Sequence, residues 1–464
     1  MEPTSYDLVV IGSGPAGQKG AIAAAKMGKR VAVIDRYDML GGVCLHAGTI
    51  PSKTLRLAVL YLTGFQQKSF YGQAYSPKSH VTVDDLMFRV RTVVEREQAQ
   101  ITDQLQRNDV TLVNGWARFV DPHTLQVEDG HQVRGDHILI ACGTRSARDP
   151  EIPYDGRKVM LAEDLGSSGH GDIPRRVIVV GAGVIGLEYA SMLSALGVRV
   201  TLIESRDTML DFVDREIIEA LRYHMRRRDA IFRLGEHVTG VRIQDNGLVR
   251  AELESGKRVT GDALLYTVGR QSNADQLGLD RIGIDTDARG RVTVNENFQT
   301  VRPHIYAVGD CIGFPALAST SMEQGRLAST HMFDGPSLKP APFFPYGIYS
   351  IPEISMVGRT EQELTAERVP YEVGKALYED VSKAQMVGDR AGMLKLIFDP
   401  DTLKLLSVHA IGEEATEIIH IGHAVIALGG TIEYFRDNVF NYPTFAEAYK
   451  VAAYDGFNKI AEVR

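Results

Sequence analysis

The sequence predicts an α/β protein, because one order of strand, glycine turn, helix and strand occurs twice. The apolar strand Leu8–Ile11 leads into the turn Gly12–Gly17 (GSGPAG), an Ala-rich helix follows, and a second strand ends at Asp35. The turn Gly181–Gly186 (GAGVIG) opens the second copy, which ends at Glu204 after the same interval. This repeat predicts two Rossmann-like domains that each bind a dinucleotide.

Each glycine of these turns has a physical role. The first permits the tight turn, the second lets a pyrophosphate approach the backbone at the helix N-terminus, and the third lets the helix pack on the strand. The acids Asp35 and Glu204 are expected to accept a bond from a ribose 2′-hydroxyl. A turn without a ligand is the alternative for either motif alone, and the repeat disfavours it. The glycines are Gly12, Gly14 and Gly17 in the first unit and Gly181, Gly183 and Gly186 in the second.

The composition describes an acidic globular chain. Its 464 residues suggest three or so domains, and 44% hydrophobic with 24% charged residues is ordinary for a globular protein. A net charge of −8 argues against nucleic-acid or anionic-membrane partners, which require a basic face.

The cysteines and the apolar runs indicate the compartment. Three widely spaced cysteines, Cys44, Cys142 and Cys311, fit a reducing environment better than a disulfide scaffold. The apolar run Val177–Leu187 is shorter than the roughly 18 residues of a membrane span, and no basic or apolar leader precedes the first strand. We therefore expect a cytoplasmic protein.

The segment Gly41–Lys53 (GGVCLHAGTIPSK) resembles the redox segment of the flavoprotein disulfide reductases, such as lipoamide dehydrogenase and glutathione reductase. In that family two cysteines form a disulfide beside the flavin. Here Cys44 occupies the first position and Thr49 the second. A dithiol relay needs two sulfurs, so the resemblance predicts a retained flavin site without the thiol chemistry.

The resemblance implies one FAD per subunit in the first nucleotide domain and a nicotinamide nucleotide, NAD(H) or NADP(H), in the second. It implies a C-terminal α+β dimerisation domain, and hence a homodimer or higher homo-oligomer. The predicted segments are residues 1–149 (FAD, first part), 150–273 (NAD(P)), 274–339 (FAD, second part) and 340–464 (dimerisation). Beyond the turn glycines and acids, the implied nucleotide-binding residues are Gly42, Cys44, Lys53, Ala117, Thr144, Gly269 and Asp310.

A second family feature is changed near the C-terminus. The family's His-Pro motif serves as the acid–base of the thiols, with a glutamate that orients the imidazole. Here Tyr442 precedes Pro443, while Glu447 matches the glutamate. A phenol with a pKa near 10 is a poor proton shuttle at neutral pH. The dithiol and its base are therefore both missing.

A flavin without a disulfide can take hydride from one nicotinamide nucleotide and return it to another. The stretches GTIPSK and FNYPTFAEAYKVAA resemble the members of the family that transfer hydride between NADPH and NAD. The resemblance implies a catalytic pair, Lys53 near the flavin N5 and Glu188 from the second domain. No metal site is expected, since His420 and His423 lack a third ligand.

The second nucleotide site carries signals for both substrates. Glu204 suits the ribose 2′-hydroxyl of NAD(H), and Arg206 could attract the 2′-phosphate of NADP(H). Arg270 and Lys257 are further basic candidates that the sequence does not place.

Two other functions remain open on the sequence alone. An NAD(P)H:quinone or dye reductase could use the same scaffold, because any acceptor that docks on the flavin could be reduced. A flavin-binding interaction protein without turnover is the second alternative. Lipoamide or glutathione reduction is disfavoured by Thr49.

Overall fold

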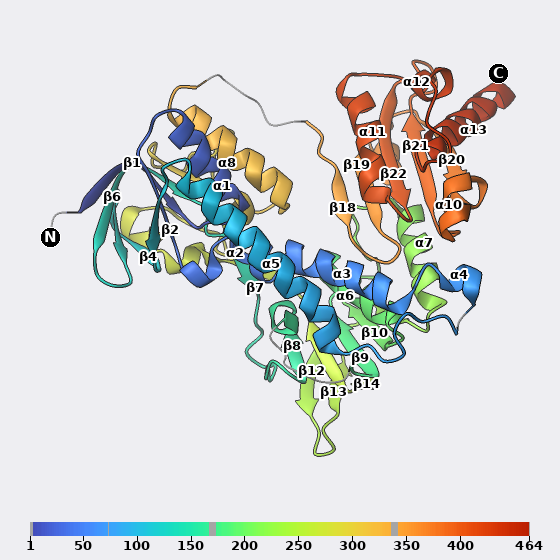
Figure 1. Cartoon of the computed structure of the whole chain (residues 1–464), viewed down its shortest axis with the longest axis horizontal. Helices are drawn as coiled ribbons and strands as arrows, with labels where there is room; N and C mark the ends of the chain where they lie inside the picture. The colour runs from blue at the N-terminus through green and yellow to red at the C-terminus, as the bar shows by residue number, and fades with distance from the viewer. Residues whose placement is uncertain (1–2, 73, 167–172, 336–341, 464) are drawn as a thin grey trace. The chain divides into compact units, whose positions relative to one another are not determined.

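The computed structural model describes residues 3–72, 74–166, 173–335 and 342–463. These residues fall into two compact units (Figure 1). The first takes its described residues from Met1–Leu55, Met87–Arg148 and Val268–Ala341, and the second from Arg56–Leu86, Asp149–Thr267 and Pro342–Arg464. The four segments given above stay a prediction, and the boundary at 339 lies outside the described residues.

A seven-stranded sheet forms the centre of the first unit. Its strands are β1 (Thr4–Ile11), β2 (Val31–Asp35), β3 (Thr111–Asn114), β4 (Ala117–Asp121), β5 (Thr124–Val127), β6 (Gln132–Ile140) and β17 (Ile305–Ala307). The order is β3-β2-β1-β6-β5-β4, with β17 beside β6. Apolar residues of β1 alternate between two buried clusters, Val9 and Ile11 in one and Leu8 and Val10 in the other. This burial on both faces is expected of parallel strands.

Two helices far apart in the sequence lie side by side in this unit, α1 (Pro15–Lys26) and α8 (Ala318–Met332) (Figure 1). Small residues permit the close approach: a Cβ on Gly325 would lie 2.0 Å from the carbonyl oxygen of Ala16. Ser329 Oγ donates to Gly20 O at 2.8 Å. The contact brings the late segment beside the helix that follows the first glycine turn.

The second unit contains a five-stranded parallel sheet in the order β11-β10-β9-β15-β8. Its strands are β8 (Val159–Leu161), β9 (Arg176–Val180), β10 (Arg199–Glu204), β11 (Ile231–Leu234) and β15 (Ala263–Tyr266). The order β11-β10-β9-β15 repeats β3-β2-β1-β6, which confirms the internal repeat predicted from the sequence. After β11 the chain forms a three-stranded antiparallel sheet. Its strands are β12 (Val238–Ile243), β13 (Val249–Leu253) and β14 (Arg258–Gly261).

The C-terminal part of the second unit is an α+β layer, as predicted. Its sheet has the order β18-β19-β22-β21-β20 and is antiparallel throughout. The strands are β18 (Tyr346–Ile348), β19 (Ile354–Gly358), β20 (Glu372–Leu377), β21 (Met393–Phe398) and β22 (Leu405–Ile411). Helices α11 (Ala415–Ala427) and α13 (Glu447–Val463) share one buried apolar core with it.

The remaining helices connect these layers. They are α2 (Gly42–His46), α3 (Thr49–Thr63), α4 (Lys68–Tyr71), α5 (Val83–Gln106), α6 (Val184–Ala195), α7 (Arg215–Arg226), α9 (Glu361–Ala366), α10 (Ser382–Val387) and α12 (Glu433–Asp437). No described helix is both long enough and apolar enough to cross a bilayer.

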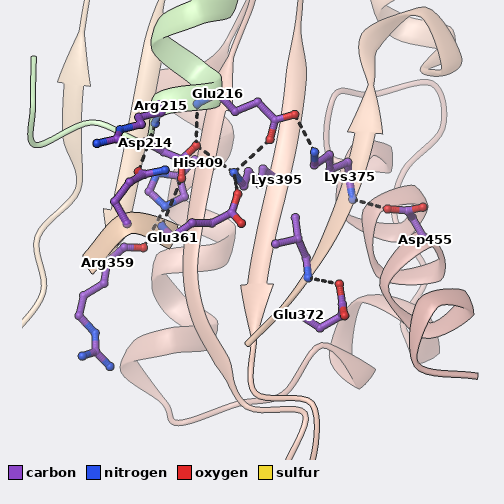
Figure 2. A network of polar contacts seen from close by, with 12 residues as sticks. Asp214, Arg215, Glu216, Arg359, Glu361, Glu372, Lys375, Lys395, His409 and Asp455 are labelled. Atoms are coloured by element: carbon purple, nitrogen blue, oxygen red, sulfur yellow. Dashed lines mark hydrogen bonds and ion pairs between the residues drawn. The ribbon is translucent and has the colours of Figure 1, made fainter. Parts of the chain in front are cut away.

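A buried charge network ties α7 to the C-terminal sheet (Figure 2). The ammonium of Lys395, on β21, has no solvent exposure and lies 2.9 Å from Asp214 and 3.1 Å from Glu216. Glu361, at the start of α9, is its third carboxylate partner. Glu216 also pairs with Lys375 on β20 at 2.6 Å. A buried charge is tolerated only when it is paired, so this network holds the two layers in one arrangement.

Candidate functional site: two nucleotide sites

The first glycine turn is joined to the predicted acid. Asp35 Oδ2 accepts bonds from Ser13 N at 2.7 Å and Ser13 Oγ at 2.6 Å. The turn closes tightly, since a Cβ on Gly17 would lie 1.9 Å from Gly12 O. The predicted segment at Gly41 also reaches this point, because its N–H donates to Ser13 Oγ at 3.0 Å. Turn, acid and redox segment therefore meet in the first unit.

Open space lies where a pyrophosphate would approach. A Cβ on Gly14 would meet no atom within 4 Å, although α1 begins at the next residue. Gly42, with φ +66°, comes close to the other side, since its Cβ would lie 3.0 Å from Gly14 Cα. A helix N-terminus with free N–H groups and an open approach is a general anion site, so these residues fit a dinucleotide phosphate.

A second acidic position of this unit is Asp310, in the turn after β17. Its Oδ2 accepts a bond from Thr144 Oγ1 at 3.4 Å. Arg270 donates to Thr144 Oγ1 at 2.7 Å and to Thr144 O at 2.8 Å, which places this basic candidate beside Asp310. Burial raises the pKa of Asp310, and the charge of Arg270 opposes that rise. Gly269 precedes this arginine with φ +81°.

Ala117 is the first residue of β4 and is buried. Beside it the sequence interpretation missed two residues. The guanidinium of Arg36 lies 5.0 Å from the ring centroid of Trp116, and the backbone N of Arg36 donates to Asp35 Oδ1 at 2.8 Å. The signal was available, because Trp116 is the single tryptophan of the chain.

Cys44 and Thr49 both lie in the first unit, Cys44 in the middle of α2 and Thr49 at the first residue of α3. The Thr49 side chain lies near the Cys44 thiol and influences its pKa. Burial raises the pKa of Cys44, and Thr49 opposes this rise. All three cysteines lie in described segments, and none forms a disulfide. The two family positions are therefore adjacent, with a hydroxyl where a second sulfur would stand.

Cys142 and Cys311 are the other two thiols. Cys311 is buried, and its Sγ lies 3.2 Å from Val308 O. The neighbouring Cys311 thiol and burial both raise the pKa of Cys142. The raised pKa of Cys142 disfavours the thiolate that nucleophilic chemistry needs.

The second glycine turn repeats the first in detail. Glu204 Oε2 accepts from Ala182 N at 2.7 Å, the position that corresponds to Ser13. A Cβ on Gly186 would lie 1.9 Å from Gly181 O, whereas one on Gly183 would meet nothing within 4 Å. This turn therefore fits a second dinucleotide.

Arg206 folds back onto the acid of this second site. Glu204 Oε1 accepts from Arg206 N and from Arg206 Nε, each at 3.1 Å. Burial alone would raise the pKa of Glu204, but the bonds from Arg206 and the backbone hold it below its ordinary value. The site therefore presents an ionised carboxylate and a guanidinium together.

Lys53 and Glu188 belong to different units, so their pairing stays a prediction. Lys53 lies on α3, and Glu188 lies on α6, where it is buried. Within the second unit Glu188 Oε1 accepts from Tyr349 N at 2.9 Å.

The structure shows the surroundings of Tyr442, which stands where the family has a histidine, and of Glu447. Tyr442 is exposed, and its hydroxyl lies 2.8 Å from Ser382 Oγ. Among the described residues, Glu447 Oε2 is buried without a hydrogen-bond partner. The carboxylate that would orient a histidine is thus present and has an unused oxygen.

One group of acids resembles a metal site in its spacing. Oxygens of Asp214, Glu216 and Glu361 lie within 4.8 Å of one another. The ammonium of Lys395 already lies among them and neutralises part of their charge (Figure 2). We assign this group to the structure rather than to a metal.

The fold and these sites define a class: an α/β protein with two Rossmann-type nucleotide sites and a separate C-terminal α+β domain. Residues 6–325 match the model of the pyridine nucleotide-disulphide oxidoreductases, and residues 344–453 match the dimerisation domain of that family. The chain belongs to the pyridine nucleotide-disulphide oxidoreductase family. It is therefore an oxidoreductase, and the family implies binding of FAD and a pyridine nucleotide.

Proteins of similar sequence align with nearly the whole length of this chain. A soluble pyridine nucleotide transhydrogenase of Mycobacterium bovis is 52% identical, with 98% of each chain covered, and one of Serratia proteamaculans is 44% identical with the same coverage. Among solved structures, LpdA from Mycobacterium tuberculosis has a TM-score of 0.88 at 26% identity and covers 97% of this chain and 99% of its own. The HOCl-induced flavoprotein disulfide reductase RclA from Escherichia coli has a TM-score of 0.87 at 26% identity, with the same coverage.

Proposed function

We propose that this protein transfers hydride between NADPH and NAD, using one FAD in each subunit of a homodimer. The observation that carries the proposal is that Cys44 has Thr49, and not a second sulfur, as its neighbour, while the chain keeps the glycine turn and the acid of each nucleotide site. The full-length relatives named soluble pyridine nucleotide transhydrogenase support it. One sulfur cannot relay electrons to a disulfide substrate, so the reducing equivalents stay with the nucleotides.

The first unit would hold FAD through residues of three segments. Bound FAD supplies an isoalloxazine that accepts hydride from a reduced nicotinamide and returns it to an oxidised one. Asp35 would accept from the adenosine ribose, and the open N-terminus of α1 at Gly14 would bind the pyrophosphate. Asp310 would accept from a ribityl hydroxyl, as an ionised carboxylate is a strong acceptor.

Lys53 and Glu188 would act at the reacting end of the site. The ammonium of Lys53 would favour negative charge on the flavin ring, since opposite charges attract strongly where water is excluded. Glu188 would fix the reach of that lysine through an ion pair. Both are proposed as catalytic residues, and neither exchanges a covalent bond.

The second unit would accept both nucleotides at one site. Glu204 would accept from the 2′-hydroxyl of NAD(H), whereas Arg206 would donate to the 2′-phosphate of NADP(H). A carboxylate alone would repel the phosphate, and a guanidinium alone would lose the hydroxyl contact. Their direct contact supports tolerance of both substrates, which the reaction requires.

The proposal is tested by mixing the purified flavoprotein anaerobically with NADPH and thionicotinamide adenine dinucleotide, whose reduced form absorbs at longer wavelength. We expect continuous formation of the reduced thio-nucleotide without added quinone or disulfide. If NADPH bleaches the flavin and the thio-nucleotide stays oxidised, while an added quinone is reduced to the quinol, the protein is a quinone reductase. If NADPH does not bleach the flavin, it is a binding protein without turnover.

The free cysteines and the nucleotide substrates indicate the cellular compartment of the protein. Three cysteines without disulfides fit a reducing compartment, and NADPH and NAD are nucleotides of the cytoplasm, where we place the protein. No nucleic-acid or membrane partner is proposed, in keeping with the net charge of −8.

A further inference from the structure

A second ion pair lies directly beside the acid of the nicotinamide nucleotide site. β11 is the parallel neighbour of β10. Backbone hydrogen bonds also join the residues that follow the two strands. Glu236 N donates to Glu204 O at 3.0 Å, and Gly235 N donates to Arg206 O at 2.8 Å. The residues after β11 therefore run alongside those after β10, where the adenosine ribose would bind.

The charged partner of Glu236 comes from a different strand pair. Lys257, at the turn between β13 and β14, places its Nζ 2.7 Å from Glu236 Oε1. Ser255 Oγ donates to the same oxygen at 2.9 Å. The carboxylate is 8% exposed whereas the lysine is 57% exposed, so the acid is fixed and the cation faces solvent. The lysine and serine bonds hold the pKa of Glu236 below its ordinary value.

Arg206 alone is poorly matched to a phosphate. Its guanidinium already contacts Glu204 and lies 3.5 Å from Asp211. A 2′-phosphate carries roughly −1.5 to −2 charges near neutral pH, like other phosphate monoesters. One cation with two carboxylate partners neutralises only part of that charge, so a second cation nearby would strengthen the binding of NADP(H).

We propose that Lys257 is this second cation and that it determines the affinity for the 2′-phosphate of NADP(H). In the absence of the phosphate Glu236 holds the lysine at the edge of the site. With NADP(H) the ammonium turns to the phosphate, while NAD(H) leaves the pair intact. The inference rests on the proposed function. Only an enzyme that binds both nucleotides needs a cation that pairs with a carboxylate when NAD(H) is bound and with the phosphate when NADP(H) is bound.

The test uses two probes that differ at the 2′ position, adenosine 2′,5′-bisphosphate and adenosine 5′-monophosphate. Their binding to the FAD-loaded protein is measured by titration calorimetry. For Lys257→Met we expect binding of the bisphosphate to weaken about tenfold, the size of one charge-assisted hydrogen bond, while binding of the monophosphate stays unchanged. In steady state the KM for NADPH should rise by a similar factor with kcat and the KM for NADH unchanged.

Arg258→Met is the matched control. It removes one positive charge at the neighbouring position, where the side chain lies 4.0 Å from Glu252 instead of Glu236. We expect no change for either probe. Lys257→Arg should restore most of the bisphosphate affinity, and the melting temperature of each variant shows whether it is folded.

The inference is overturned if Lys257→Met weakens both probes equally, which would mark a purely structural pair, or if it weakens neither. Failure of the proposed function is separate. A protein that binds the bisphosphate through Lys257 but forms no reduced thio-nucleotide would refute transhydrogenation and leave the inference standing.

Discussion

The buried position of Asp310 disfavours the ionised form of its carboxyl group. Burial raises its pKa, so the charged form that FAD would use is disfavoured in the empty protein. Between the ordinary pKa of about 4 and the raised value, the folded state binds more protons than the unfolded state, and stability falls as the pH rises.

We therefore expect Asp310→Asn to raise the melting temperature of the FAD-free protein at pH 7 and to weaken FAD binding about tenfold, through loss of a charge-assisted bond. Calorimetry of the apoprotein and fluorescence titration with FAD measure the two effects. A lower melting temperature in the apoprotein would contradict this view of the site.

The neighbours Cys44 and Thr49 allow a direct test of the lost thiol chemistry. Thr49→Cys places a second sulfur near the first, because the side chain of Thr49 lies close enough to influence the pKa of Cys44. Without the base, however, we expect lipoamide or glutathione reduction at least about 100-fold below that of Thr49→Cys/Tyr442→His, the range of general acid–base catalysis.

Disulfide-dependent NADH oxidation compares the two variants. In the double variant the new imidazole would find the unused Glu447 Oε2 as its orienting group. Equal turnover of the single and double variants would show that Tyr442 is no obstacle.

Residue identity and spacing singled out the glycine turns and the acids Asp35 and Glu204. The sequence did not predict that each acid also accepts a bond at 2.7 Å from a backbone N–H of its own turn. The ion pair of Glu236 with Lys257 could not be foreseen, since it depends on how one strand pair folds over another. For the same reason the sequence could not place Arg270 beside Thr144.

At the scale of elements, the Lys395 network joins helices and strands that no sequence pattern connects (Figure 2). Burial opposes the ionisation of Asp214, but its bonds and the surrounding cations keep its pKa below the ordinary value. The pKa of Glu216 is lowered in the same way by Lys375 and Lys395. Acids with lowered pKa values stabilise the fold above a pH of about 4 and lose that effect as the pH falls further.

Lys395→Met should destabilise the protein by about 3–5 kcal/mol at pH 7, because it leaves the buried Asp214 carboxylate without its cation. Lys375→Met removes a partly exposed lysine from the same network and should cost only about 0–1 kcal/mol. Urea unfolding measures both.

The decrease in the free energy of unfolding caused by Lys395→Met should become smaller as the pH falls from 7 towards 4, because the carboxylates that have lost their cation can then take up protons. A loss that is independent of pH would mean that packing of the lysine stem, and not its charge, stabilises this region.

At the scale of the whole molecule, exposed apolar side chains gather in the dimerisation domain. Leu428, Tyr434, Val439 and Tyr442 are exposed within one short stretch, and Val439 is 94% exposed. Such a cluster is expected of a surface that a second copy covers.

We expect Val439→Asp to raise the dissociation constant of the dimer about tenfold or more, because an aspartate would be buried there unpaired. Analytical ultracentrifugation measures the change. Val301→Asp, at a position that is 73% exposed outside the dimerisation domain, is the control and should leave the dimer intact. Equal behaviour of both variants would place the subunit contact elsewhere.

The repeat of two parallel sheets was predictable because each copy carries its own strand, turn and acid in order. A helix position also followed from sequence pattern: an Ala-rich helix was predicted after the first glycine turn, and α1 spans Pro15–Lys26. The pairing of β17 with β6 was beyond sequence reasoning. It joins residues far apart in the chain, through backbone bonds that no side-chain pattern encodes.

The half-exposed cations of the second nucleotide site have a further consequence. Arg206 is 45% exposed and Lys257 57% exposed, so mobile ions screen both over a distance of about 8 Å at 0.15 M ionic strength. The hydroxyl contact of Glu204 carries no such dependence. We expect the ratio of KM for NADPH to KM for NADH to rise steadily with added potassium chloride, and a flat ratio would contradict this. A cell that accumulates salt under osmotic stress would thereby turn the enzyme towards its unphosphorylated nucleotide without any change in the protein.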